Sequence, residues 1–243
     1  MRFTSETSSE GVLEQLFLLG DIPGVLWTPR GADGTRPLIA MGHGGGQSKK
    51  APDIVDRARR FVAERGFAAV AVDAPSHGDR PEHEEFTRIA TEYEARLDTG
   101  EELAELIADF RALVVRQIVP EWQTVLNAVQ KLSHVGIGPV GYWGVSLGSV
   151  LGVPLIAAES RIRAAVLGLA GAEVSTETAA RITVPVEFLV QWDDERVPRP
   201  QSLALFDAFT SSEKTLHANP GKHGEVPAFE TDSTLRFFAR HLG

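Results

Sequence analysis

The sequence predicts an α/β fold: a doubly wound, mostly parallel sheet with an N-terminal β-hairpin and a small helical insertion. Short apolar runs that stop at glycine or polar residues alternate with segments whose apolar residues recur at helical spacing. Strands that alternate with helices pair in parallel and carry helices on both faces. The chain has 243 residues and no internal repeat or linker. We therefore expect 1–243 to form a single domain.

Apolar runs and turn residues predict the elements of the first half. Residues 12–28 contain two apolar stretches around a Gly-Asp-Ile-Pro turn, which indicates a hairpin. The runs at 37–46 and 67–75 are buried strands, and the first of them stops in glycines. Helical spacing predicts a helix over 51–65. Residues 82–113, rich in Glu, Ala and Leu, are predicted to be an inserted helical segment.

The second half continues the same alternation. A helix over 120–134 has a proline in its first turn, and a strand over 138–146 leads directly into a further helix. Then follow strands over 164–170 and 185–192, a helix over 200–210, a strand over 214–220 and a helix over 227–241.

Composition excludes several classes of function. The net charge is −9 and the densest basic stretch is DRARR (56–60), so neither nucleic acid nor an anionic membrane is an expected partner. The chain has no cysteine, which excludes disulfides, thiolate zinc sites and a cysteine nucleophile. It has no signal-peptide core and no run of about 18 apolar residues. The expected location is the cytoplasm.

The stretch GVSLG (144–148) lies between a predicted strand and a predicted helix. It matches G-x-S-x-G, in which glycines let the backbone pass closely around a serine on a sharp turn. The pattern alone is weak because Gly and Ser are common in turns, so its context carries the interpretation. A serine such as Ser146 is a poor nucleophile unless it has a base, an acid that orients the base, and donors for an oxyanion.

Candidate oxyanion donors come from two places. The glycines of GHGGGQS (42–48) leave backbone N–H groups free to point into a site. The N–H of Leu147 lies at a predicted helix start, where the helix dipole favours negative charge. A nucleotide-binding loop fits less well, because no lysine follows these glycines at phosphate-loop spacing and Gln47 stands where a dinucleotide fingerprint needs glycine.

The acid and the base are expected later in the chain, after strands. Asp193 and Asp194 follow the strand at 185–192, although loop aspartates are most often turn residues. His223 falls in a loop between the last strand and the last helix, whereas His217 lies within the strand pattern and is expected in the core or at its edge.

Other histidines are given structural interpretations. His43 stands beside the glycine loop and is expected to brace it. Histidines and acidic residues also gather in SHGDRPEHEE (76–85), but their spacing matches no metal motif, so a solvated loop is favoured. No metal and no cofactor are expected.

With these residues in view, the sequence resembles the α/β-hydrolase superfamily over essentially the whole chain. It is most like the single-domain group of dienelactone hydrolases and prolyl-oligopeptidase-like catalytic domains. LIAMGHGGG resembles the oxyanion-loop strand, AVAVDAPSHGDR the D-x-P-x-H-G segment, and DDERVP the D-x-x-V-P signature. The superfamily's order of nucleophile, acid and base corresponds to Ser146, Asp194 and His223.

The resemblance also selects between candidates. Its D-x-x-V-P signature implies Asp194 rather than Asp193, since the aspartate stands three residues before Val197. It implies Gly45, the residue after His-Gly, as the second oxyanion donor. The dienelactone hydrolases look like enzymes with a cysteine nucleophile, whereas this chain has Ser146. The β-propeller of the prolyl-oligopeptidase group is absent from this sequence. The resemblance therefore implies neither the dienelactone hydrolase reaction nor peptidase activity.

The predicted function is a serine hydrolase that cleaves a carboxylic ester, thioester or related acyl bond through an acyl-enzyme intermediate. Its partner is a small-molecule acyl substrate, and the chain is expected as a monomer or homodimer. The alternatives are a carbon–carbon bond hydrolase or a cofactor-free perhydrolase on the same fold, or a non-catalytic binding module. As a further hypothesis, 82–113 forms a small lid whose acidity disfavours anionic acyl groups.

Overall fold

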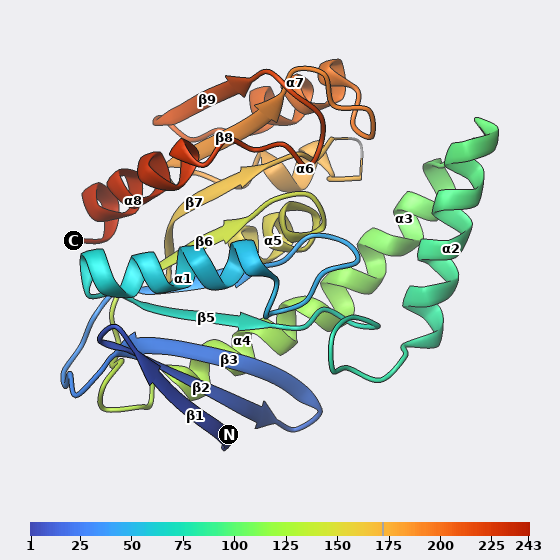
Figure 1. Ribbon diagram of the computed structural model, residues 1–243. Coiled ribbons are helices and arrows are strands. Elements are labelled where there is room, and N and C mark those ends of the chain that lie inside the picture. Colours follow the sequence, from blue (N-terminus) through green and yellow to red (C-terminus); the bar gives the residue numbers. More distant parts are fainter. Residues whose placement is uncertain (172) are drawn as a thin grey trace.

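The computed structural model describes residues 1–171 and 173–243 and is built around a nine-stranded sheet (Figure 1). The strands are β1 (Arg2–Ser9), β2 (Val12–Leu19), β3 (Ile22–Pro29), β4 (Leu38–Gly42), β5 (Ala68–Val72), β6 (Val140–Gly144), β7 (Ile162–Gly168), β8 (Val186–Gln191) and β9 (Lys214–Asn219). Their spatial order is β1-β2-β3-β5-β4-β6-β7-β8-β9. Strands β1, β2, β3 and β5 pair antiparallel with one another in that order. From β5 through β4, β6, β7 and β8 to β9, every pair is parallel.

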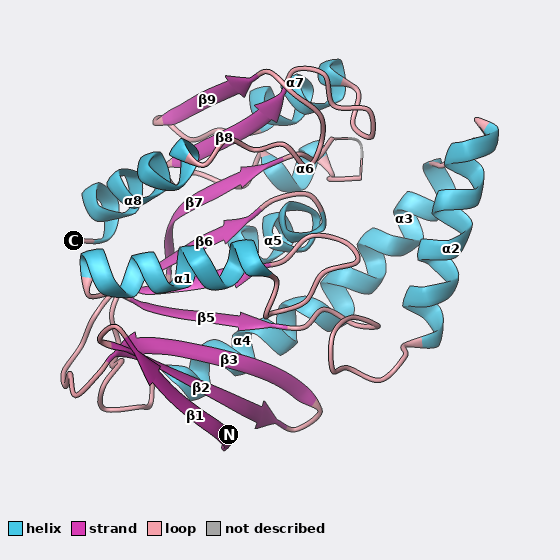
Figure 2. Cartoon of the chain, viewed as in Figure 1, coloured by secondary structure: helices cyan, strands magenta, loops and turns pink. Residues whose placement is uncertain are grey.

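Helices cover both faces of the sheet (Figure 2). They are α1 (Pro52–Arg65), α2 (Glu84–Thr99), α3 (Ala104–Leu113), the π-helical turn η1 (Val114–Ile118), α4 (Val119–Val129), α5 (Leu147–Ala158), α6 (Thr176–Ala179), α7 (Arg199–Ala208) and α8 (Phe229–Leu242). One apolar cluster buries α4, α5 and α7 against one face, and a second buries α1 and α8 against the other. The predicted doubly wound α/β fold is therefore confirmed.

The chain order places loops where a site can form. The parallel strands run in one direction, so their carboxyl ends meet at one edge of the sheet. The loops after β4, β6, β8 and β9 all leave from that edge or beside it (Figure 1). Helices α2 and α3 stand beyond the same edge and pack against each other. They share a small apolar cluster that includes Phe86, Ile89 and Leu106.

Three features of the fold differ from the sequence-based expectation, one of them the short helix α6, for which the sequence predicts no element. Strand β1 is also absent from that expectation, because all eight residues of β1 are exposed and show no apolar alternation. The helices predicted over 82–113 and 120–134 are not separated by a loop: α3, η1 and α4 follow one another without a break from Ala104 to Val129. No helix in the described ranges is both long and apolar enough to cross a membrane.

Candidate active site

Ser146 lies at the sharp turn between β6 and α5. Its backbone has φ 55° and ψ −124°, a region that costs a non-glycine residue about 1–3 kcal/mol. The Ser146 N–H donates to the carbonyl of Gly168 on the neighbouring strand at 2.9 Å, which holds the turn in place. Strain of this kind persists only where surrounding structure over-determines it, and it is concentrated at functional sites.

Steric crowding explains both glycines of the G-x-S-x-G motif. A Cβ on Gly144 would lie 2.9 Å from the backbone of Gly148, and a Cβ on Gly148 would lie 2.4 Å from the carbonyl oxygen of Gly42. Side chains at these positions would force α5 away from β6 and β4. The glycines therefore allow the helix to start directly behind the serine.

The loop between β9 and α8 brings His223 against Ser146. The His223 Nε2 lies 2.9 Å from the Ser146 Oγ, and its Nδ1 lies 2.8 Å from the Asp194 Oδ2. The other carboxylate oxygen of Asp194 accepts the backbone N–H groups of Arg196 and Val197, both at 2.9 Å. The Asp194 side chain is 4% exposed, so it is fixed and shielded from water. The three side chains form one hydrogen-bonded row.

Asp193 takes no part in that row. Its backbone N–H donates to the Gly221 carbonyl at 3.1 Å, which ties the two loops together. The structure thus separates the two adjacent aspartates that the residues alone left as alternatives, and Asp194 is the one that contacts His223.

The predicted oxyanion donors flank the same serine. Gly45 lines the cavity that contains Ser146 and His223. Leu147 is the first residue of α5, where a helix leaves its backbone N–H groups without intrahelical partners. Gly45 and Leu147 thus both line the cavity beside Ser146, and their role as donors to an oxyanion stays a prediction.

Buried polar groups brace the glycine loop. His43 is 2% exposed, and its Nε2 accepts the Ala74 N–H at 3.0 Å. Burial lowers the pKa of His43. The fully buried Asp73 accepts both the backbone N–H and the Nζ of Lys49, at 2.8 and 2.6 Å. The sequence predicts that His43 braces the loop, but nothing in it indicates Lys49 and Asp73, whose pairing across 24 residues follows no motif.

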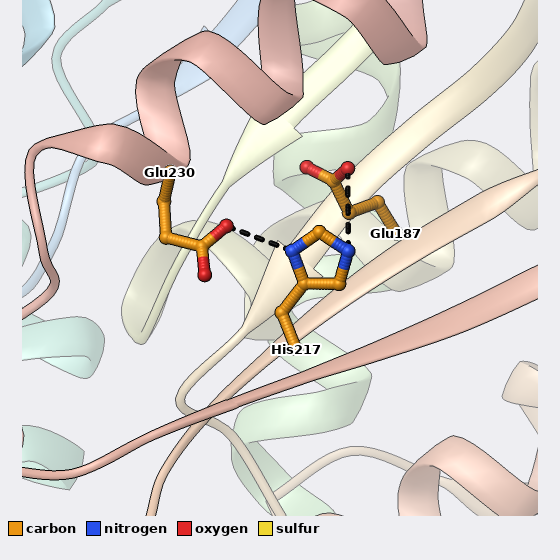
Figure 3. A group of neighbouring side chains, drawn as sticks. All are labelled: Glu187, His217 and Glu230. Carbon is orange, nitrogen blue, oxygen red and sulfur yellow. Dashed lines mark hydrogen bonds and ion pairs between the residues drawn. The ribbon is translucent and has the colours of Figure 1, made fainter.

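A second group of titratable side chains lies between β8, β9 and α8 (Figure 3). The His217 Nδ1 is 2.7 Å from Glu230 and its Nε2 is 3.7 Å from Glu187. Both glutamates are 3% exposed, and burial raises the pKa of Glu187. Their donor atoms lie within 4.8 Å of one another, close enough to hold a metal ion.

The protein itself already uses this second group. Asn219 donates to Glu230 at 2.8 Å, and Ser233 donates to Glu187 at 2.9 Å. The cluster thus fastens α8 to β8 and β9, which agrees with the expected place of His217 at the edge of the core. The stretch at 76–85 has several structural roles: Asp79 pairs with Lys49, the His83 Nδ1 accepts the N–H of Phe86 in the first turn of α2, and His77 lines the cavity beside Ser146.

No family model and no curated protein matches the chain. Among solved structures, a cold-adapted esterase from an Arctic intertidal metagenomic library is 30% identical over 100% of both chains, with a TM-score of 0.79.

Two more distant structures share the fold. The acetyl xylan esterase from Paenibacillus sp. R4 is 16% identical, with 99% of this chain and 88% of that chain covered and a TM-score of 0.72. Acetyl xylan esterase 1 from Thermoanaerobacterium sp. JW/SL YS485 is 18% identical, with 98% and 87% covered and a TM-score of 0.70. The chain belongs to the α/β-hydrolase superfamily, and its fold is that of the superfamily's esterases. The resemblance found in the sequence is confirmed.

Proposed function

We propose that this chain is a serine hydrolase that cleaves a carboxylic ester, thioester or related acyl bond through an acyl-enzyme intermediate. The hydrogen-bonded row of Ser146, His223 and Asp194 carries the proposal. A serine on a strained turn, within 2.9 Å of a histidine that a buried carboxylate orients, is the arrangement that makes a hydroxyl nucleophilic. The esterase fold of the chain supports the same reaction.

The proposed steps follow from the positions of the atoms. The Ser146 Oγ attacks the carbonyl carbon while the His223 Nε2 takes its proton. Asp194 holds the His223 Nδ1–H, which keeps Nε2 free as the base and stabilises the imidazolium. The N–H groups of Gly45 and Leu147 donate to the oxyanion. His223 then protonates the leaving alcohol or thiol, and water attacks the acyl-enzyme with His223 again as the base.

A covalent probe tests this assignment directly. Wild type incubated with a fluorophosphonate is expected to gain one adduct, read by intact mass, and Ser146→Ala to gain none. Ser212→Ala, which changes an exposed serine outside the cavity, serves as the matched control and should label like wild type. Ester turnover by Ser146→Ala should fall roughly 10⁴- to 10⁶-fold. An adduct on Ser146→Ala, or none on a folded wild type, would contradict the proposal.

A further inference from the structure

A cavity of about 260 Å³ opens beside Ser146, and most of its wall is apolar. Helices α2 and α3 contribute Phe86, Ile89, Leu106 and Phe110, and α5 contributes Leu147 and Val150. Acyl transfer at Ser146 does not by itself require these side chains. Such a wall favours an apolar ligand, because burying apolar surface away from water is favourable.

The polar groups of the cavity are few, and most of them are engaged by one another. The Tyr93 hydroxyl donates to Glu173 at 2.7 Å, and Glu173 also accepts the Gly171 N–H at 3.1 Å. Burial, followed by the bond to Glu173, raises the pKa of Tyr93, so this phenol stays a donor. At the rim, Arg196 pairs with Glu94 at 2.6 Å.

The charges around the cavity are predominantly negative. Two carboxylates, Glu94 and Glu173, and one guanidinium, Arg196, line it. Arg196 is paired with Glu94, and Arg111 interacts electrostatically with Glu173, so both guanidinium groups already face a protein carboxylate. A carboxylate on the substrate would meet this field in a partly dehydrated site, where like charges repel more strongly than in water.

We propose that this cavity selects uncharged esters whose apolar group fills the space between α2, α3 and Leu147. The two helices are then specificity-determining elements of the site, and Ala90 on α2 is a position that sets the size of the group. This inference rests on the proposed function of Ser146. The apolar group can be the acyl chain or the alcohol, and the chemistry that the wall recognises is the same for both.

A substrate series tests the apolar preference. With p-nitrophenyl esters, kcat/KM should rise from acetate through butyrate to hexanoate by roughly fourfold for each methylene that the cavity buries. A parallel series of acetate esters of straight-chain alcohols shows whether the cavity takes the acyl or the alcohol group. The p-nitrophenyl monoester of adipic acid has the same chain length as hexanoate, with a carboxylate in place of the terminal methyl group. It should react at least about tenfold more slowly, with a smaller gap at high salt.

A matched pair of variants tests the role of α2. Ala90 and Ala95 are both exposed alanines on α2, but only Ala90 lines the cavity. Ala90→Trp should lower the ratio of hexanoate to acetate turnover about tenfold, because the indole occupies space that the chain would fill. Ala95→Trp should leave the ratio unchanged.

The outcomes separate this inference from the function on which it rests. A protein that hydrolyses acetate esters, shows no length preference in either series and treats the adipate monoester like hexanoate would overturn the specificity assignment alone. An equal effect of Ala90→Trp and Ala95→Trp would also overturn it. A folded protein that hydrolyses no ester and takes no fluorophosphonate adduct would remove the proposed function as well.

Discussion

At the scale of single residues, His43 shows how a ring that touches no substrate can control the site. Its Nδ1 bonds the Gly44 carbonyl at 2.8 Å while its Nε2 accepts the Ala74 N–H. These two bonds require the neutral tautomer with the proton on Nδ1. The ring thereby joins the glycine loop after β4 to the segment after β5, and Gly45, the proposed oxyanion donor, lies in that loop.

This tautomer makes stability depend on pH. Burial lowers the pKa of His43 in the folded chain. Below about pH 6.5, His43 is therefore protonated in the unfolded chain while it is still neutral in the folded chain. The free energy of unfolding should therefore decline on acidification, with His43 contributing at most about 1.4 kcal/mol per pH unit. Urea unfolding between pH 8 and pH 5 measures it. His43→Asn should be less stable at pH 8 but show a shallower decline, and parallel curves would contradict the assignment.

Chain order and strand ends limit where a side chain can lie in this fold. Ser146, Asp194 and His223 each follow a predicted strand, and the structure brings the three side chains together, while their catalytic roles stay predictions. Lys49 and Asp73 gave no such signal. A lysine after a glycine loop and an aspartate after a strand are ordinary surface residues until folding places one against the other.

At the scale of elements, Gln191 at the end of β8 fastens the loop that carries His223. Its Nε2 lies 2.9 Å from the Glu225 carbonyl, 3.3 Å from that of Lys222 and 3.4 Å from that of Pro220. The side chain is 1% exposed, so water does not compete for these bonds. A strand thus positions a loop through one amide.

We expect Gln191→Leu to impair turnover more than folding. The Gln191 Oε1 is buried without a partner among the described residues, so leucine removes an unsatisfied oxygen along with the three donated contacts. The freed loop should let His223 drift from Ser146. The expected result is a roughly 10- to 100-fold lower kcat with nearly unchanged KM. Steady-state kinetics and a melting curve measure both effects. A lower Tm with full kcat would show a purely structural role.

Hydrophobic periodicity predicted the helices that bury one face, and it missed the elements that bury almost no side chain. Helices α1 and α8 show a clear apolar stripe, and both lie close to their predicted ranges. The short α6 buries only one residue, and β1 buries none. Strand β1 is placed by backbone pairing with β2, and α6 begins at a cap in which the Ser175 side chain accepts the Thr178 N–H; neither leaves a hydrophobic pattern in the sequence.

At the scale of the whole molecule, apolar burial is unevenly distributed. Two large clusters enclose the sheet from both faces, whereas four buried side chains form the cluster between α2 and α3. Helix α2 is also held by partly exposed polar pairs such as Arg196 with Glu94, which contribute at most about 1 kcal/mol each. Local opening should therefore cost less there than in the sheet.

Hydrogen exchange followed by mass spectrometry checks this distribution. Backbone amides of α2 are expected to exchange at least about tenfold faster than those of β4 and β6 under native conditions. A substrate analogue that fills the cavity should slow exchange in α2 and α3 and leave β1 unaffected. Equal protection of α2 and β6 in the free protein would contradict the expectation.

Helices α3 and α4 are joined through η1 without a break, so the position of α3 is fixed by that of α4. Helix α4 is clamped beneath the sheet by Trp122 and Val125, which are 4% and 0% exposed. Swinging α3 outward would require breaking a continuous helical backbone in its middle, whereas α2 is joined on both sides by loops. Substrate should therefore reach Ser146, and product should leave it, on the α2 side. Helix α2 would move for this, while α3 stays in place.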